Sequence, residues 1–290
     1  MGETNVKKAA IINACGKYSK VMLALVVNAV LARILSAEEY GIVAIITVFT
    51  TLFSTVADMG FGVAIVQNKT LDDEDINSVF SLTIYLGIVL MVLFFLFSFV
   101  ISDIYQNKVY IPLGGVISLS LLFNTWNMVL NGLLNRNKEF IKLSVRTVVG
   151  YLSSSIIAII LALLGFSYFS IAIQSVIASV VVFVWNYIDL KPKFRLAIAK
   201  KSIKKVANYS MFQFAFNLVN YFARNLDNLL VGRFMGNELL GYYSKSYTLM
   251  LYPVNNLAGV VTPVMHPILS DNQSNKKELY NRYMKIVKIL

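Results

Sequence analysis

The sequence predicts an all-α, polytopic transmembrane helical bundle. Hydrophobic residues make up 57 % of the chain and charged residues only 14 %, whereas soluble domains carry about 25 % charged residues. Mean hydropathy is +0.67. Stretches of roughly 20 residues that are almost free of charge recur along the chain, and a helix of that length crosses the hydrocarbon core of a bilayer. Such a chain is too apolar to fold around one aqueous core.

Eight membrane spans and the start of a ninth are expected. Turn-forming stretches such as NKTLDDED, NRNKEF and LLGFSYF separate several of them. Because the chain stops inside an apolar helix, we expect it to be a C-terminally truncated piece of a longer protein. The expected spans cover residues 9–35, 41–66, 80–101, 113–134, 145–164, 169–188, 209–230 and 242–269, and the ninth starts near residue 283.

Lysine and arginine set the expected orientation in the membrane. Most of them fall in the N-terminal tail and after the second, fourth, sixth and eighth spans, whereas the opposite loops hold only Arg33, Lys108 and Arg233. Loops rich in these residues stay in the cytoplasm, so the N-terminus is predicted to be cytoplasmic. The net charge of +11 is therefore interpreted as a topology signal, and no nucleic-acid partner is expected.

The residue types needed for a soluble catalytic module are scarce. The chain has one cysteine, Cys15, and one histidine, His266, which cannot supply a disulfide framework, a cysteine zinc site or a histidine metal cluster. No nucleophile-elbow, metalloprotease, CxxC or phosphate-loop motif occurs in the sequence. We therefore expect no catalytic residue, no metal and no cofactor.

A basic stretch over residues 189–208 separates the sixth and seventh spans. Its lysines alternate with apolar residues, a pattern also found in helices that lie on anionic lipid surfaces. Two interpretations are open: the stretch recognises lipid head groups, or it links two halves of the protein and its charges enforce the topology. The second interpretation is favoured.

Two short segments of the chain repeat. RILSAEEYG at residues 33–41 and RFMGNELLG at residues 233–241 share arginine, glutamate and glycine at positions displaced by 200 residues. Gly41 and Gly241 follow a helix end and are expected to allow a tight turn into the next span. Six spans separate the copies, an even number, so both halves have the same orientation, as in a parallel repeat.

A polar stripe runs along the first and seventh spans. In the first span its members recur at intervals of 4, 3 and 8 residues, which puts them on one face of a helix. Two related lobes that face each other across a polar seam are typical of transporters. We therefore expect a central cavity between two lobes, the second of them incomplete. The stripe consists of Asn13, Lys17, Lys20 and Asn28 in the first span and Gln213, Asn217, Asn220, Arg224, Asp227 and Asn228 in the seventh.

A lysine in the middle of a membrane span costs free energy, because its charge leaves water. Lys20 lies about 16 Å along the helix from Ala9, near the bilayer centre, where a cation costs about 2.5–3.5 kcal/mol. We therefore place Lys17 and Lys20 on a hydrated cavity, and a cationic cavity implies an anionic cargo. The alternative is that these polar side chains only hydrogen-bond helices together; it is less favoured for the cations.

Carboxylates and amides complete the candidate site. Asp58 in the second span is a candidate proton or ion site, and so is Asp227, which can pair with Arg224 three residues earlier. One serine and three asparagines follow one face of the fourth span, where helix–helix hydrogen bonding is favoured; they are Ser120, Asn124, Asn127 and Asn131. The candidate substrate-binding residues are Lys17, Lys20, Asn28, Asn217, Asn220, Arg224 and Asn228, and the candidate ion-coupling residues are Asp58 and Asp227.

Two long segments resemble a known family. ARILSAEEYGIVAIITVFTTLFSTVADMGFGVAIVQ resembles the signature region of bacterial polysaccharide-transport flippases of the Wzx type, and NYFARNLDNLLVGRFMGNELLGYYSKSYTLMLYPVNNLAGVVTPVMHPILS is similar to the start of their second half. These flippases belong to the multidrug, oligosaccharidyl-lipid and polysaccharide exporter superfamily. The resemblance implies a V of two six-helix lobes, here residues 1–188, a linker over 189–208, and the first part of the second lobe over 209–290.

The resemblance also implies a function. Such flippases carry undecaprenyl-pyrophosphate-linked oligosaccharide, including O-antigen units of lipopolysaccharide, across the bacterial inner membrane to its periplasmic leaflet. The implied partners are this lipid-linked sugar, membrane lipids and other polysaccharide assembly proteins, with a proton or a sodium ion as coupling ion. The pyrophosphate is an anion of the kind that a cationic cavity requires.

Two rival functions stay open. A multidrug exporter of the same superfamily would bind cationic drugs and would need acidic residues in the cavity, which the lysines disfavour. A membrane polysaccharide polymerase or ligase would need a long outer loop with catalytic arginine or histidine residues, and the expected outer loops are short. An enzyme is therefore not expected.

Overall fold

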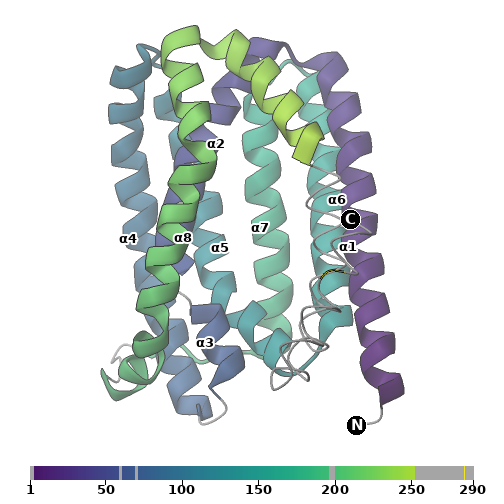
Figure 1. Ribbon diagram of the computed structural model, residues 1–290, viewed down its shortest axis with the longest axis vertical. Coiled ribbons are helices and arrows are strands. Elements are labelled where there is room, and N and C mark those ends of the chain that lie inside the picture. Colours follow the sequence, from purple (N-terminus) through teal and green to yellow (C-terminus); the bar gives the residue numbers. More distant parts are fainter. Residues whose placement is uncertain (1–2, 59–60, 69–70, 196–199, 252–283, 285–290) are drawn as a thin grey trace. The chain divides into compact units, whose positions relative to one another are not determined.

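In the computed structural model, residues Met1–Ser244 form one compact unit, a bundle of long helices (Figure 1). Residues Lys245–Leu290 belong to a second unit. The contacts described below lie within the first unit. The described residues contain helices and no strand, which confirms the predicted all-α class. The structure describes residues 3–58, 61–68, 71–195, 200–251 and 284, without the side chains of residues 3–17, 63, 67 and 200–213.

Eight helices are defined among the described residues. Five of them, α2, α4, α5, α6 and α7, are long and apolar enough to cross a membrane. The chain is therefore a multi-pass membrane protein, as predicted. Residues 237–251 are also helical. The helices are α1 (Glu3–Ile34), α2 (Ala37–Asp58), α3 (Phe61–Gln67), α4 (Asp73–Tyr105), α5 (Tyr110–Arg136), α6 (Phe140–Leu163), α7 (Phe169–Leu190) and α8 (Lys200–Met235).

The helices α1 and α8 coincide with the first and seventh predicted spans, but they do not belong to the five apolar helices. They contain 32 and 36 residues, enough to cross a bilayer. Polar and charged residues recur along both of them. Hydrocarbon does not solvate such groups, so they need another environment.

The predicted second span, residues 41–66, falls on two described helices. α2 ends at Asp58, and a separate short helix, α3, follows. α3 packs its buried Ile65 against α5. The ninth predicted span and most of the eighth, residues 242–269, lie outside the described residues.

The main hydrophobic core lies between α2, α4 and α5. Phe94 of α4 and Tyr110 of α5 are fully buried in it. Phe53 of α2 meets the Phe94 ring edge to face, with ring centroids 5.1 Å apart. On the other side of α4, Leu96 is 56 % exposed. Apolar groups on both faces suit a helix that packs on its neighbours with one face and contacts lipid with the other.

A capping box begins α4. The Asp72 carboxylate accepts the backbone N–H of Asp75 at 2.7 Å, and the Asp75 carboxylate accepts the backbone N–H of Asp72. We expect Asp72→Ala to lower the free energy of unfolding by about 1 kcal/mol, because the cap is lost. Denaturant unfolding in detergent micelles measures this change. Asp73→Ala removes an exposed carboxylate from the same turn and should have a much smaller effect; equal losses would contradict the cap.

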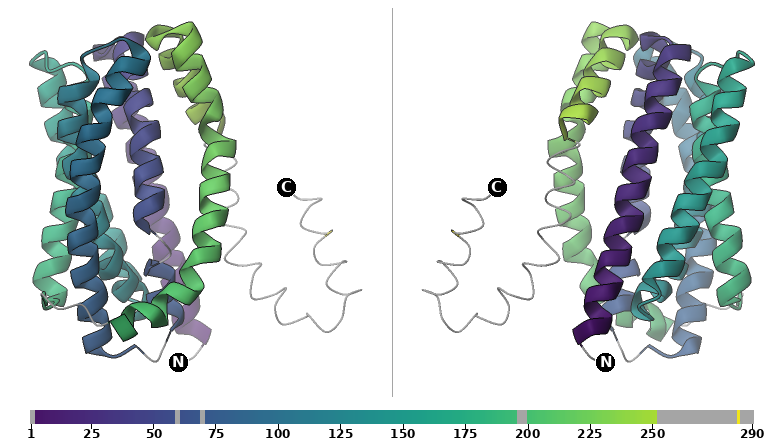
Figure 2. Two further views of the ribbon diagram at one scale, coloured as in Figure 1. Left: turned by 90° about the vertical axis from the view of Figure 1, so that its left-hand side faces the viewer. Right: turned by 90° about the vertical axis from the view of Figure 1, so that its right-hand side faces the viewer.

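The segment after α7 is held against the start of α4. The backbone N–H of Lys193 donates to the side-chain oxygen of Asn77 at 2.8 Å, and that of Arg195 donates to the Ser81 hydroxyl at 2.9 Å. The first turns of α8 then lie obliquely across the end of the bundle (Figure 2). The predicted linker, residues 189–208, thus has an anchored beginning, and its last residues are part of α8.

Candidate functional site

The two copies of the predicted repeat have the same direction in the structure. α1 and α8 both run away from the end of the bundle that carries the N-terminus (Figure 1). α1 packs mainly against α6, whereas α8 packs against α2, α4 and α3. The polar helices of the two halves, α1 and α8, therefore pack against different helices.

The repeated glycines bring the two halves into direct contact. A Cβ built onto Gly41 would lie under 3.0 Å from the backbone carbonyl of Asn237, and one built onto Gly241 would lie equally close to the carbonyl of Ala37. The contact is reciprocal, because the two pairs are displaced by 200 residues. Both glycines lie within helices and neither has a positive φ. Their expected role in a tight turn is therefore wrong; they let two backbones approach closely.

Lys20 is exposed on α1. Its ammonium lies 5.9 Å from the centre of the Tyr151 ring of α6, within cation–π range. Farther along α1, Val27 and Leu31 are buried in the contact with α6. Lys20 therefore lies at the edge of this contact and outside the packed core. Lys17 lies in α1 as expected, but its side chain is outside the described part of the structure.

The two asparagines that the repeat relates, Asn28 and Asn228, bond within their own helices. The Asn28 amide donates to the Ala24 carbonyl at 2.8 Å. Asn228 is 9 % exposed, and its backbone N–H donates to the carboxylate of Asp227 at 2.8 Å. Asn228 thus faces packed neighbours, while Asn28 is half-buried.

Arg224 and Asp227 do not pair in the described part of the chain. Asp227 accepts a hydrogen bond from the Tyr243 hydroxyl at 2.7 Å, while Arg224 is exposed. The expected ion pair is therefore wrong, because a tyrosine of the following helix binds the carboxylate. Asn220 is exposed one turn before Arg224, and Asn217 is half-buried. The exposed members of the candidate site on α8 are thus one cation and one amide.

Asp58 is the last residue of α2 and is half-buried. It makes no hydrogen bond or ion pair with another described residue. Among the described side chains, no interaction joins Lys20 to Arg224, and no group of three or more His, Cys, Asp or Glu side chains can hold a metal ion.

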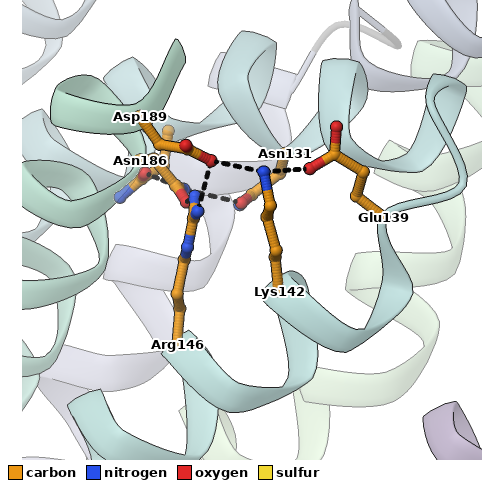
Figure 3. Close-up of polar contacts among 7 residues, drawn as sticks. Asn131, Glu139, Lys142, Arg146, Asn186 and Asp189 are labelled. Carbon is orange, nitrogen blue, oxygen red and sulfur yellow. Dashed lines mark hydrogen bonds and ion pairs between the residues drawn. The ribbon is translucent and has the colours of Figure 1, made fainter.

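A buried polar cluster joins α5, α6 and α7 (Figure 3). Asn186 of α7 donates to the side-chain oxygens of Asn127 and Asn131 at 2.9 and 3.0 Å. Asn127 also donates to the carbonyl of Ser179 at 3.2 Å. Two members of the predicted polar row on the fourth span therefore hold helices together, as favoured, whereas Asn124 is exposed.

Arg146 lies at the centre of this cluster, a role that was not predicted from the sequence. It is 3 % exposed, donates to the Asn186 side chain at 2.8 Å and pairs with Asp189 at 2.5 Å. Lys142 lies one turn earlier and pairs with Asp189 at 3.0 Å and with Glu139 at 2.6 Å. The sequence indicated only that both basic residues follow the fourth span, near the predicted cytoplasmic side. The sequence held one sign of this cluster: Asn186 and Asp189 lie one helical turn apart at the end of the sixth predicted span.

The chain matches known proteins along most of its length. The model of a family described as "Polysaccharide biosynthesis protein" matches residues 30–290. The teichuronic acid biosynthesis protein TuaB of Bacillus subtilis (strain 168) is 27 % identical over 83 % of this chain and 50 % of its own length. The lipopolysaccharide biosynthesis protein WzxC of Escherichia coli (strain K12) is 24 % identical, over 92 % and 55 %.

A third relative is named as a transport protein. The succinoglycan biosynthesis transport protein ExoT of Rhizobium meliloti (strain 1021) is 22 % identical over 86 % of this chain and 51 % of its own length. The chain thus spans about half the length of these curated relatives. No solved structure matches it.

Proposed function

Because the chain belongs to the polysaccharide biosynthesis protein family, we propose that it takes part in moving undecaprenyl-pyrophosphate-linked oligosaccharide across the bacterial inner membrane. The cargo enters from the cytoplasmic leaflet, on the side of the N-terminus, and leaves at the periplasmic leaflet. Relatives named for lipopolysaccharide, teichuronic acid and succinoglycan biosynthesis support a cargo of this class. The protein acts as a transporter and performs no chemical step on the sugar.

One observation carries the proposal: Lys20 and Arg224 are exposed on two long polar helices of an otherwise apolar bundle. A cation that faced lipid at this depth would cost several kcal/mol. A hydrated route between the halves avoids that cost and attracts a diphosphate. The amides of Asn217 and Asn220 extend the polar face of α8 toward the sugar, and Lys17 is a further candidate cation for the diphosphate.

The repeat supports alternating access. The halves that contain α1 and α8 rock against each other, so that the polar faces are reached from one side of the membrane at a time. The lipid tail stays in the bilayer. Asp58 is the preferred site for a coupling proton or sodium ion, because it has no described partner, whereas Asp227 is bound by Tyr243.

Binding to the purified protein tests this function. In lipid nanodiscs, we expect undecaprenyl pyrophosphate to bind at least about tenfold more tightly than undecaprenol, a difference of about 1.4 kcal/mol that comes from the diphosphate. The cationic dye ethidium serves as the drug-like probe. Equal affinity for the two lipids, or ethidium binding that displaces undecaprenyl pyrophosphate, would contradict the proposal and favour a multidrug exporter.

A further inference from the structure

The segment that follows α7, residues 191–195, carries cations at every second position. At the end of α7, Lys191 takes a left-handed conformation with a φ of 45°, and Pro192, which has no backbone N–H, cannot extend the helix. The basic residues of the segment are exposed, and Phe194 between them is 47 % exposed. The segment leads toward α8, which begins at the end of the bundle that carries the N-terminus (Figure 1). Its cations therefore lie at the predicted cytoplasmic face.

Hydrogen bonds hold this segment on α4. The backbone N–H groups of Lys193 and Arg195 donate to the side chains of Asn77 and Ser81, which lie one helical turn apart. The Arg195 guanidinium also pairs with the Glu74 carboxylate at 3.2 Å. A segment that is fixed in this way presents its cations in a set arrangement, so an anion that binds them does not have to order the chain first.

Exposed aromatic side chains accompany these cations. The Phe194 ring lies 5.7 Å from the ring of Tyr85 of α4, and Tyr187 near the end of α7 is 45 % exposed. Aromatic residues next to lysine and arginine are typical of the membrane–water interface, where the rings contact lipid and the cations reach the head groups. A free phosphate gains nothing from such rings, whereas an anionic phospholipid offers both a charged head group and apolar chains.

We propose that residues 191–195 form a binding site for an anionic phospholipid of the cytoplasmic leaflet, with Lys193 and Arg195 on its phosphate and Phe194 against its acyl chains. Of the two interpretations that the sequence left open for this stretch, the anchored and exposed arrangement supports lipid recognition. The Glu74 carboxylate occupies the Arg195 guanidinium and therefore competes with the phosphate. The site uses none of the candidate substrate-binding residues, so it does not depend on the proposed function.

Native mass spectrometry of the purified protein, titrated with one lipid at a time, tests the site. We expect the first dioleoylphosphatidylglycerol to bind at least about tenfold more tightly than dioleoylphosphatidylcholine. Arg195→Gln should weaken the binding of phosphatidylglycerol about fivefold, the share of one cation near the membrane surface, and Arg195→Lys should restore most of it. Lys138→Gln is the matched control, because it removes an exposed cation from another connection. Equal losses in Arg195→Gln and Lys138→Gln would reveal only general attraction of a basic protein for anionic lipid and would overturn the site.

Two further variants test the separate parts of the site. Glu74→Gln removes the competing carboxylate and should tighten the binding of phosphatidylglycerol at least about twofold, although exposed cations usually gain little from such changes. An unchanged affinity would contradict the assignment of Arg195 to the phosphate. Phe194→Ser keeps every charge and should weaken the same binding at least about twofold. If Phe194→Ser binds as tightly as the original protein, and inorganic phosphate displaces the lipid, the segment binds free anions and the lipid site is overturned.

Discussion

Replacing Lys20 with glutamate should weaken the binding of undecaprenyl pyrophosphate at least about 100-fold, or nearly 3 kcal/mol. Two unit charges 4 Å apart interact by about 4 kcal/mol at an effective dielectric constant of 20. Charge reversal turns this attraction into repulsion, and added salt reduces the effect. The dissociation constant in nanodiscs, measured at two salt concentrations, reports the change.

Two control variants test whether the loss of affinity depends on the position of the charge. Lys20→Arg keeps the cation and should bind within a few-fold of the original protein. Lys108→Glu makes the same change in net charge at an exposed residue of the opposite loop and should leave the affinity unchanged. If Lys20→Glu folds normally and binds the lipid as tightly as Lys20→Arg does, then Lys20 is not part of the binding site.

The second large effect concerns stability. Asp189→Leu should lower the free energy of unfolding by about 3 kcal/mol, because it leaves the buried guanidinium of Arg146 without its carboxylate. This loss is at the low end of the range for removing one partner of a buried ion pair, because the Asp189 side chain is 33 % exposed. The double variant Arg146→Met/Asp189→Leu removes both charges and should recover most of the loss. Unfolding in detergent, analysed as a double-mutant cycle, measures the coupling.

An exposed ion pair provides the comparison for this cycle. Arg195 and Glu74 pair at 3.2 Å with side chains that are 43 % and 75 % exposed, so Glu74→Ala should cost less than about 1 kcal/mol. If Asp189→Leu costs no more than Glu74→Ala, the cluster around Arg146 does not hold α6 and α7 together. If the double variant is as unstable as Asp189→Leu, the loss comes from altered packing and not from the unpaired charge.

The apolar helices were predictable because the bilayer fixes their length. The fourth predicted span, residues 113–134, lies within α5, and the sixth, residues 169–188, lies within α7. The direction of α1 and α8 also followed from the sequence, because an even number of spans separates the copies of the repeat. These features depend only on local composition and on the number of spans that separate the two copies.

Features that depend on distant partners were not predictable in the same way. Arg146 was counted only among the basic residues that follow the fourth span, but Asn186 and Asp189, some forty residues away in the chain, make it part of the helix packing. The glycines of the repeat were recognised, yet their role depends on the carbonyls of Ala37 and Asn237. The two aspartates of the candidate site differ for the same reason: a hydroxyl of the next helix binds Asp227, while Asp58 has no described partner.

Labelling of single cysteines by a membrane-impermeant thiol reagent tests the hydrated cationic route most directly. In the Cys15→Ala protein in proteoliposomes, we predict that cysteines at positions 17, 20 and 224 react and that undecaprenyl pyrophosphate protects them. A cysteine at position 96, on the lipid-facing side of α4, should stay unlabelled. If positions 17, 20 and 224 are as unreactive as position 96 from both sides of the membrane, their side chains face lipid or protein, and no charged route exists between the two halves.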